Sequence, residues 1–241
     1  MASTLCHRLR VTCLEQVRRQ RIVLFQDRAD AGKKLAERLS KYANRPDVIV
    51  LALPRGGVPV AFEIAQKLHA PLDVFLVRKL GVPGQEELAM GAIASGGVRV
   101  VNPGVVKSLG ISEESLEAVA AREGRELERR ASAYRGDRPA LDVSGRTVIL
   151  VDDGLATGAS MRAAVAALRL QKPARIVVAV PTAAPETCAA LRPEVDELVC
   201  LETPTPFFGV GAWYKDFSQL GDEEVRSFLE RARQPAKEET S

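Results

Sequence analysis

The chain has few of the residues that hold metal ions or form disulfide bonds. It contains two histidines and four cysteines among 241 residues, and none of them has the spacing of a zinc or redox motif. Cys188 and Cys200 lie in apolar stretches, so we interpret them as buried small hydrophobic side chains. The pattern therefore suits a protein of the reducing cytoplasm.

Charge excess and long hydrophobic runs are also missing. The 34 basic and 31 acidic residues leave a formal net charge of +3, which by itself gives no reason to expect nucleic-acid binding. No apolar run approaches the roughly 20 residues that a membrane-spanning helix needs. With 46% hydrophobic and 27% charged residues, the composition is typical of a globular protein with one sizeable core and at most a small appendage.

Four regions are expected along the chain. Residues 1–21 carry five arginines and one acid, which indicates a basic, flexible extension, an organelle presequence or a nucleic-acid-binding arm, of which we favour the extension. Residues 22–201 are predicted to form the main domain. Residues 202–233 form a C-terminal segment that ends in a helix, and residues 234–241 form a disordered tail.

Strand-like apolar runs alternate with amphipathic helices through the main domain. Buried strands are predicted at residues 48–53, 74–77, 146–151, 175–180 and 197–201. This alternation predicts an α/β fold, with a parallel sheet and helices on both of its faces. Asp30 is expected to cap the first helix. A long helix from Ser112 to about Tyr134 is either structural or a subunit contact, and in the second case the protein is a homodimer.

The most informative stretch is VILVDDGLATGAS, residues 148–160. An apolar strand leads into Asp152 and Asp153, and a loop of small residues then opens a helix. Free backbone N–H groups at a helix start suit a phosphate, and the hydroxyls of Thr157 and Ser160 can donate to its oxygens. Acids at a strand end can be simple capping residues, but the whole string favours a site for a phosphorylated sugar. Neither the Walker pattern nor the dinucleotide-binding glycine pattern is present.

A second glycine-containing turn, Pro-Arg-Gly-Gly, follows the strand at residues 48–53. Gly56 and Gly57 allow backbone conformations that are closed to other residues. Arg55 places a guanidinium group at the carboxyl end of the strand, where ligands bind in open α/β sheets. We interpret this turn as a pyrophosphate-binding element, and the alternative is an ordinary strand-to-helix connection.

Residues 148–160 closely resemble the motif with which type I phosphoribosyltransferases bind phosphoribosyl pyrophosphate (PRPP), and the Pro-Arg-Gly-Gly turn resembles their pyrophosphate loop, which often contains a non-proline cis peptide bond. The resemblance implies their Rossmann-like fold with a small C-terminal hood. It assigns Asp152 and Asp153 to the ribose hydroxyls. It assigns the 5′-phosphate to Ala156, Thr157, Gly158, Ala159 and Ser160. Hypoxanthine-guanine enzymes carry an Asp where this chain has Ala156, so this loop is not expected to move a proton on the acceptor base.

Residues 89–94 and 98–101 are predicted to form two strands that pair across Ser95-Gly96-Gly97. This region resembles the flexible catalytic loop of the family, which forms a lid over the reacting centre. Arg78 and Lys79, expected at the end of a strand, are predicted to meet the charge of the leaving pyrophosphate. Glu86 or Glu87 is predicted to handle a proton on the acceptor. The alternative is that all four are ordinary solvated side chains without a catalytic role.

Aromatic residues make up only 5% of the chain, yet several gather in the C-terminal segment. Phe208, Trp213 and Tyr214 are predicted to form the hood and to stack on a nucleobase. The alternative is that these rings close the core beneath the last helix, and both interpretations stay open.

The implied reaction belongs to nucleotide metabolism. The phosphoribosyl group of PRPP would pass to a nucleobase or a related nitrogen heterocycle, with release of pyrophosphate. Mg²⁺ is the implied cofactor, and Asp152 and Asp153 would act on it mainly through water. Two alternatives stay open: a non-catalytic PRPP sensor that regulates transcription or RNA, and a ligand-binding remnant with another partner.

Overall fold

A computed structural model describes residues 25–234, so the expectations for residues 1–21 and 235–241 lie outside the described part of the chain. At its centre is a parallel sheet of five strands in the order β2-β1-β6-β7-β8. These strands are β1 (Val48–Ala52), β2 (Leu72–Val74), β6 (Thr147–Val151), β7 (Arg175–Thr182) and β8 (Glu197–Glu202). The predicted α/β fold is confirmed.

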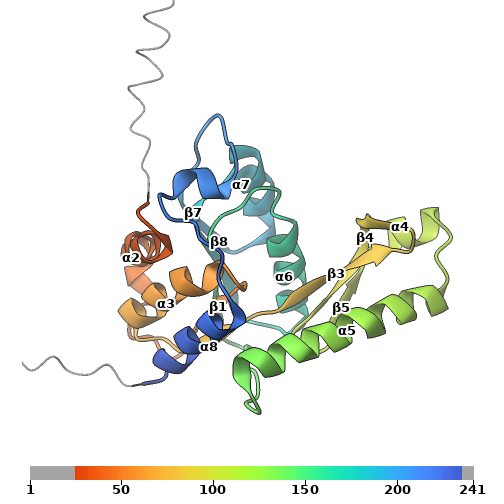
Figure 1. Ribbon diagram of the computed structural model, residues 1–241, viewed down its shortest axis with the longest axis horizontal. Coiled ribbons are helices and arrows are strands. Elements are labelled where there is room, and N and C mark those ends of the chain that lie inside the picture. Colours follow the sequence, from red (N-terminus) through yellow and green to blue (C-terminus); the bar gives the residue numbers. More distant parts are fainter. Residues whose placement is uncertain (1–24, 235–241) are drawn as a thin grey trace, which may run out of the picture.

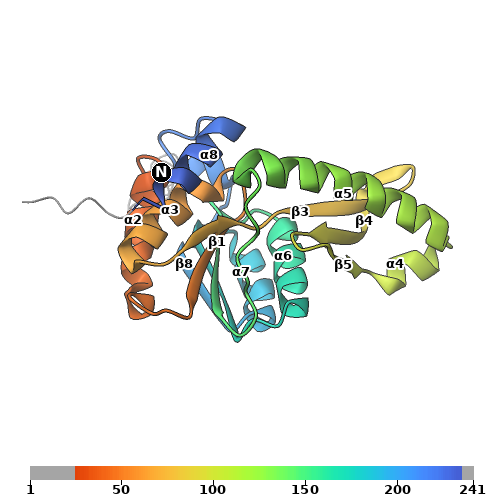
Figure 2. The same ribbon diagram turned by 90° about the horizontal axis from the view of Figure 1, so that it is seen from below.

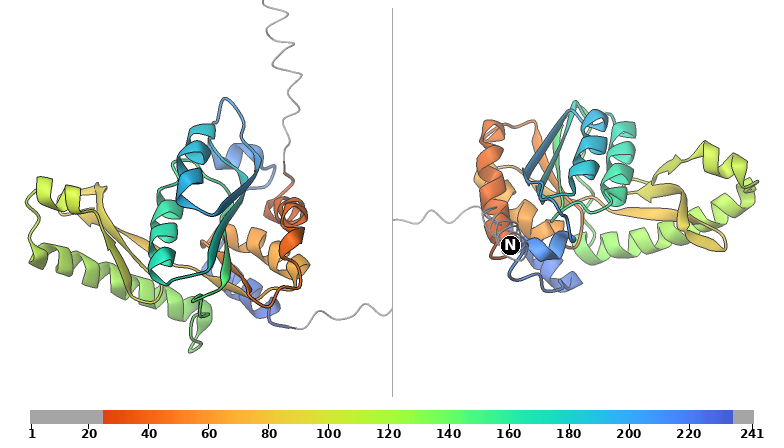
Figure 3. Two further views of the ribbon diagram at one scale, coloured as in Figure 1. Left: turned by 180° about the vertical axis from the view of Figure 1, so that it is seen from behind. Right: turned by 90° about the horizontal axis from the view of Figure 1, so that it is seen from above.

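Helices cover both faces of this sheet (Figure 1 and Figure 3). One face packs against α2 (Arg28–Arg38), α3 (Gly57–Leu68) and α8 (Asp222–Arg231), and the other against α6 (Ala159–Leu170) and α7 (Pro185–Leu191). Strand β1 sends Val48, Val50 and Ala52 to the first face and Ile49 and Leu51 to the second. Strands buried on both faces are apolar throughout, and this made most of them recognisable in the sequence.

The strand order creates a switch point between β1 and β6. From β1 the chain crosses outward to β2, and it later returns on the other side of β1 as β6. The helices that follow these two strands, α3 and α6, cover opposite faces. The two loops therefore diverge at the carboxyl edge of the sheet, which is where ligands bind in folds of this kind. They are the two loops that the sequence singled out, at residues 53–57 and 152–158.

An antiparallel arm projects from the main sheet (Figure 2). It consists of β3 (Val77–Val82), β4 (Gln85–Ala94), β5 (Val98–Val101), α4 (Pro103–Ser108) and α5 (Glu113–Arg135). Leu80, Met90 and Leu116 are among the residues of its own small core. The long helix and the pairing of β4 with β5 were predicted. The third strand, β3, was not, because its glycine and the following Pro-Gly turn indicated irregular structure.

The strand predicted at residues 74–77 is wrong. Strand β2 ends at Val74, and the chain then leaves the main sheet to begin β3. At this junction, Nε of Arg135 donates to both carboxylate oxygens of Asp73 at 2.8 and 2.9 Å, and the same guanidinium donates to the carbonyl of Val74. This buried ion pair ties the last turn of α5 to β2. The apolar run continues across the junction, so hydrophobicity alone could not reveal the change of sheet.

The C-terminal segment packs against the beginning of the described chain. The N–H of Phe25 donates to the carbonyl of Trp213 at 2.9 Å, and the N–H of Lys215 donates to the carbonyl of Phe25 at 2.9 Å. The short 3₁₀ helices are η1 (Ser40–Tyr42), η2 (Arg192–Glu194) and η3 (Val210–Trp213). Within residues 25–234, no helix combines the length and apolar character that crossing a membrane requires.

Candidate active site

A loop of small residues, residues 156–160, connects the acids after β6 to the first turn of α6. We call it the phosphate loop, after the ligand predicted for it. Gly158 has a φ of 72°, a left-handed conformation that favours glycine, and it directly precedes α6. Within residues 25–234, the backbone N–H groups of Thr157, Gly158 and Ser160 have no hydrogen-bond partner. These three residues line a cavity of about 170 Å³, together with Asp152 and Val210 among others. Free donors at the positive end of a helix fit a phosphate group.

The loop is supported from behind by Thr187 of α7. Its hydroxyl donates to the carbonyl of Ala156 at 2.5 Å. Its methyl group lies so close to Gly158 that a Cβ added there would be 2.7 Å away. Thr187 was not identified from the sequence, because only the packing of α7 brings it to the loop.

Replacing Thr187 by valine should therefore weaken anion binding without unfolding the protein. Loss of one hydrogen bond of about 1 kcal/mol corresponds to a fivefold to tenfold loss of PRPP affinity. Isothermal titration calorimetry with PRPP and Mg²⁺ measures this affinity. Thr147→Val is the matched control, because the Thr147 hydroxyl makes a comparable bond to Asp47 at 2.9 Å, at the opposite end of β6. Equal PRPP affinity of Thr187→Val and the wild type would contradict the assigned role.

The two acids after β6 have different surroundings. Asp152 lines the cavity, and its Oδ1 accepts the N–H of Asp153 at 2.9 Å. The Oδ2 of Asp153 accepts from Nε of Arg28 at 2.9 Å, and its backbone carbonyl accepts from the hydroxyl of Tyr214 at 2.6 Å. Asp152 is thus the acid beside the phosphate loop, whereas Asp153 is held between α2 and the C-terminal segment.

Burial shifts the titration of both acids. It raises the pKa of Asp152 well above the ordinary value for an aspartate, and the neighbouring Asp153 charge adds to this rise. Burial also raises the pKa of Asp153, although the guanidinium of Arg28 opposes that shift. Two poorly solvated carboxylates favour a ligand that donates hydrogen bonds or carries positive charge. Sugar hydroxyls and a hydrated cation meet this requirement.

The turn after β1 lies directly against the acid pair. A Cβ added to Gly56 would be 2.0 Å from Oδ2 of Asp153, and one added to Gly57 would be 2.7 Å from the carbonyl oxygen of Val151. Only glycine permits this approach. The Pro54–Arg55 peptide bond is cis, as the family resemblance implied. The side chain of Arg55 is half exposed, with Nη1 at 4.0 Å from Oδ1 of Asp222. The structure therefore brings the two predicted loops together.

The four predicted catalytic residues of the lid lie on the arm. Arg78 and Lys79 are inside β3 and not at the end of a strand of the main sheet, which corrects the prediction. Arg78 donates through Nε and Nη2 to Glu123 of α5 at 2.9 and 2.6 Å. Lys79 lies 3.3 Å from the carboxylate of Glu87, and Glu86 and Glu87 are exposed on β4. None of them lines the cavity at the phosphate loop. A catalytic role for these residues stays a prediction.

The aromatic residues of the C-terminal segment divide between the two interpretations. The ring of Tyr214 is only 6% exposed and packs between Phe25 and Phe217, so its predicted stacking on a base is wrong. Its hydroxyl instead holds the backbone of Asp153. Trp213 is partly buried in the same cluster. Phe208, at 79% exposure, is the most exposed large hydrophobic side chain among the described residues and is available to a ligand.

Arg28, which pairs with Asp153, is the main residue beside the acid pair that the sequence did not reveal. Helix α2 begins at Arg28, and its N-cap is Asp27, whose side chain accepts the N–H of Asp30 at 2.8 Å. The prediction that Asp30 caps the helix is therefore wrong by almost one turn. No local pattern relates Arg28 to Asp153, which follows much later in the chain.

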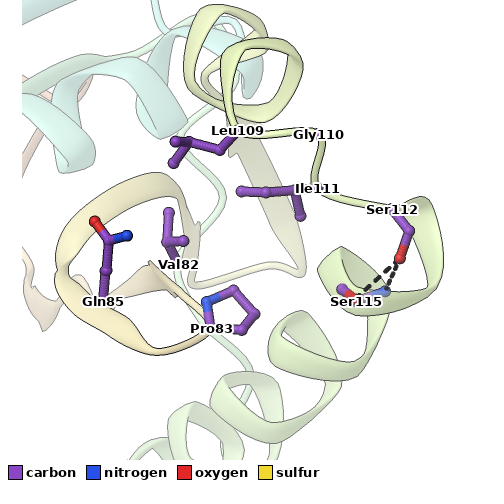
Figure 4. A pocket seen from close by; sticks show the side chains of 8 residues that line it. All are labelled: Val82, Pro83, Gln85, Leu109, Gly110, Ile111, Ser112 and Ser115. Carbon is purple, nitrogen blue, oxygen red and sulfur yellow. Dashed lines mark hydrogen bonds between the residues drawn. The ribbon is translucent and has the colours of Figure 1, made fainter.

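A second hollow, of about 330 Å³, lies at the outer end of the arm (Figure 4). Its lining comes from the β3–β4 turn and from the connection between α4 and α5, and it includes Val82, Pro83, Leu109 and Ile111. No ionisable side chain is among its lining residues. The groups that suit acid–base or phosphate chemistry gather at the carboxyl edge of the main sheet instead.

Comparisons with known proteins give matches over most of the chain. The family model of the phosphoribosyl transferase domain matches residues 22–216. A Mycobacterium tuberculosis protein, named as a candidate phosphoribosyl transferase, is 48% identical over 209 residues, which are 87% of this chain and 47% of the relative. The chain thus spans about half the length of that relative.

Two further relatives cover different shares of the chain. The bifunctional protein PyrR of Chloroflexus aurantiacus is 35% identical over 129 residues, which are 52% of this chain and 65% of that protein. The crystal structure of TT1426 from Thermus thermophilus superimposes with a TM-score of 0.76 at 46% identity, and the match covers 86% of this chain and 97% of that chain.

Proposed function

This chain belongs to the phosphoribosyl transferase domain family, and we propose that it transfers the 5-phosphoribosyl group of PRPP to a nitrogen of a nucleobase or related heterocycle, with release of pyrophosphate. The contact between Gly56 and Asp153 carries the proposal. It joins an Arg-Gly-Gly turn, a carboxylate pair and a loop of free N–H groups into one site. A pentose that bears a phosphate, hydroxyls and a pyrophosphate is complementary to all three.

Each part of the site has a role in binding PRPP. The loop at residues 156–160 binds the 5′-phosphate through its free N–H groups and through the hydroxyls of Thr157 and Ser160. Asp152 and Asp153 accept hydrogen bonds from the ribose hydroxyls. Arg55 and the glycine backbone beside it bind the pyrophosphate, because a guanidinium forms paired, charge-assisted bonds with phosphate oxygens.

These contacts support displacement at the anomeric carbon. The bond from that carbon to the pyrophosphate oxygen breaks, a bond to the acceptor nitrogen forms, and the ribose ring carries positive charge in between. The acceptor nitrogen gives up its proton to Glu86, to Glu87 or to water. The carboxylate pair stabilises that charge, and Arg55 stabilises the negative charge of the leaving group. Ala156 cannot take a proton from the acceptor. The loop therefore contributes to the rate by positioning PRPP and by electrostatic stabilisation. Phe208 is the proposed stacking surface for the acceptor base.

The site fits Mg²⁺ as a cofactor that arrives with the substrate. Among residues 25–234, no group of three or more His, Cys, Asp or Glu side chains could hold a metal ion. Mg²⁺ keeps several waters and often takes its remaining ligands from phosphates and one or two carboxylates. Asp152 and Asp153 would hold it mainly through water. When bound, the ion neutralises charge on the pyrophosphate.

The proposed activity can be tested by supplying PRPP and Mg²⁺ with a panel of nucleobases and measuring pyrophosphate release. Release that depends on both the base and Mg²⁺ supports the transferase. Tight PRPP binding without turnover of any base would favour the sensing alternative instead. Absence of PRPP binding would contradict both.

Asp153→Asn should reduce PRPP binding or turnover at least tenfold, which is about 1.4 kcal/mol. The amide keeps the shape of the carboxylate but loses its charge and one acceptor oxygen, so both the ribose hydroxyls and Arg28 lose a partner. PRPP titration and pyrophosphate release measure the effect. Asp142→Asn, an exposed acid outside the site, is the control. Wild-type behaviour of Asp153→Asn would remove this carboxylate from its assigned role.

A further inference from the structure

Arg28 joins three segments that are far apart in the sequence. Its side chain, which is only 11% exposed, starts in the first turn of α2. Its Nε donates to Oδ2 of Asp153 at 2.9 Å, and its Nη1 donates to the carbonyl of Ser218 at 2.9 Å. Its guanidinium carbon lies 3.9 Å from the centre of the Phe217 ring. One side chain thus connects α2, the acid pair and the C-terminal segment.

The position of Asp153 depends on few contacts. Its backbone is held by Tyr214 and by the N–H bond to Asp152. Among residues 25–234, Arg28 is the only cation within ion-pair distance of the Asp153 carboxylate. The same Oδ2 atom faces Gly56 at a distance that excludes a Cβ there. A rotation of this carboxylate would therefore disturb both the sugar contacts and the pyrophosphate turn.

We propose that Arg28 is a positioning residue for sugar recognition. It holds the Asp153 carboxylate in the orientation that accepts the ribose hydroxyls, and it couples this orientation to the placement of the C-terminal segment through Phe217 and Ser218. The assignment rests on the proposed function, because that function places a ribose at Asp153. The beginning of α2 is accordingly part of the active site, although it supplies no group that touches the substrate.

The chemistry of the side chain explains why arginine occupies this position. A guanidinium is planar and can donate along its edge to two acceptors while its face lies on an aromatic ring. Lysine keeps the charge but offers neither the fixed fork nor the flat face. Loss of the cation would leave a largely buried carboxylate without its partner, which is strongly unfavourable and frees the carboxylate to reorient.

Titration of the full chain with PRPP and Mg²⁺ tests this role without an identified acceptor. Arg28→Ala should bind PRPP at least tenfold more weakly than the wild type, and Arg28→Lys should recover part of the loss. Arg38→Ala is the matched control, because Arg38 lies exposed in the last turn of the same helix. It should bind like the wild type. Thermal denaturation verifies that each variant is folded, and Arg28→Lys carries the test if the alanine variant is not.

A double variant separates positioning from general damage. If Arg28 acts through Asp153, Arg28→Ala should weaken PRPP binding less than threefold when Asp153 is already asparagine. Losses that multiply in the double variant would overturn the assignment, and so would wild-type affinity of both Arg28 variants. A wild-type protein that binds no PRPP would overturn the proposed function and this assignment with it. Binding by the wild type with unaffected Arg28 variants would overturn only the assignment.

Discussion

Gly56→Ala is expected to lower PRPP affinity by about a hundredfold, equivalent to about 2.7 kcal/mol. The added Cβ would lie 2.0 Å from Oδ2 and 2.6 Å from Cγ of Asp153. Because Arg28 holds that carboxylate, Asp153 cannot simply turn away, and the turn and the acid must separate. The hydroxyl-binding and pyrophosphate-binding groups would then no longer match one ligand.

Gly124→Ala provides the matched control for this substitution. Gly124 lies within α5, where an added Cβ would meet only Cδ1 of Ile93, at an ordinary 3.5 Å. Alanine in a helix interior is favoured over glycine by up to about 1 kcal/mol, so this variant should be at least as stable as the wild type and bind PRPP equally well. The measurements are PRPP titration and thermal denaturation. A Gly56→Ala protein with wild-type affinity would show that the two loops do not form one binding site.

Among the proposed variants, Arg135→Ala should lower the free energy of unfolding most, by about 3–5 kcal/mol. The reason is that it leaves the carboxylate of Asp73 buried without its partner. The side chains of Arg135 and Asp73 are 6% and 3% exposed, and Asp73 also accepts the N–H of Leu141 at 3.3 Å. The pair fastens α5 to β2 at the point where the chain passes from the main sheet to the arm. Urea unfolding followed by circular dichroism measures the change.

Two further variants show whether burial of the charge is the cause. Asp73→Leu combined with Arg135→Met removes both charges and should recover part of the lost stability, as often happens when a buried pair is replaced by apolar residues. Arg45→Ala breaks an exposed ion pair with Asp47 and should change the unfolding midpoint little. If Arg135→Ala were no more destabilising than Arg45→Ala, the pair would not anchor the arm.

Much of the fold and part of the site could be predicted from the sequence. Strands β1 and β6 and most of β7 are apolar and buried because both faces of the sheet are covered, so local composition marks them. The edge strand β8 is only partly buried, and its apolar middle is flanked by Glu197 and Glu202. The loops after β1 and β6 have small residues because backbone N–H groups and close approaches are needed there. Each of these signals is contained in a few consecutive residues.

The boundary of the arm could not be predicted from such local signals. The apolar residues after Asp73 continue across the junction between β2 and β3, and only the ion pair with Arg135 marks the end of the main sheet. Arg78 and Lys79 were placed at a strand end for the same reason. They belong to a second sheet, where Arg78 pairs with Glu123.

The sequence by itself determined the α/β architecture, the acid pair and the two glycine-containing loops, because strand burial and tight turns restrict the residues at each position. Only the tertiary structure decided that Gly56 touches Asp153, that Thr187 supports the phosphate loop, and that Tyr214 packs in the core. It also decided that Arg28 reaches Asp153. These contacts join residues that are far apart in the chain, and the packing of whole helices brings them together, so no short stretch of sequence carries a signal for them.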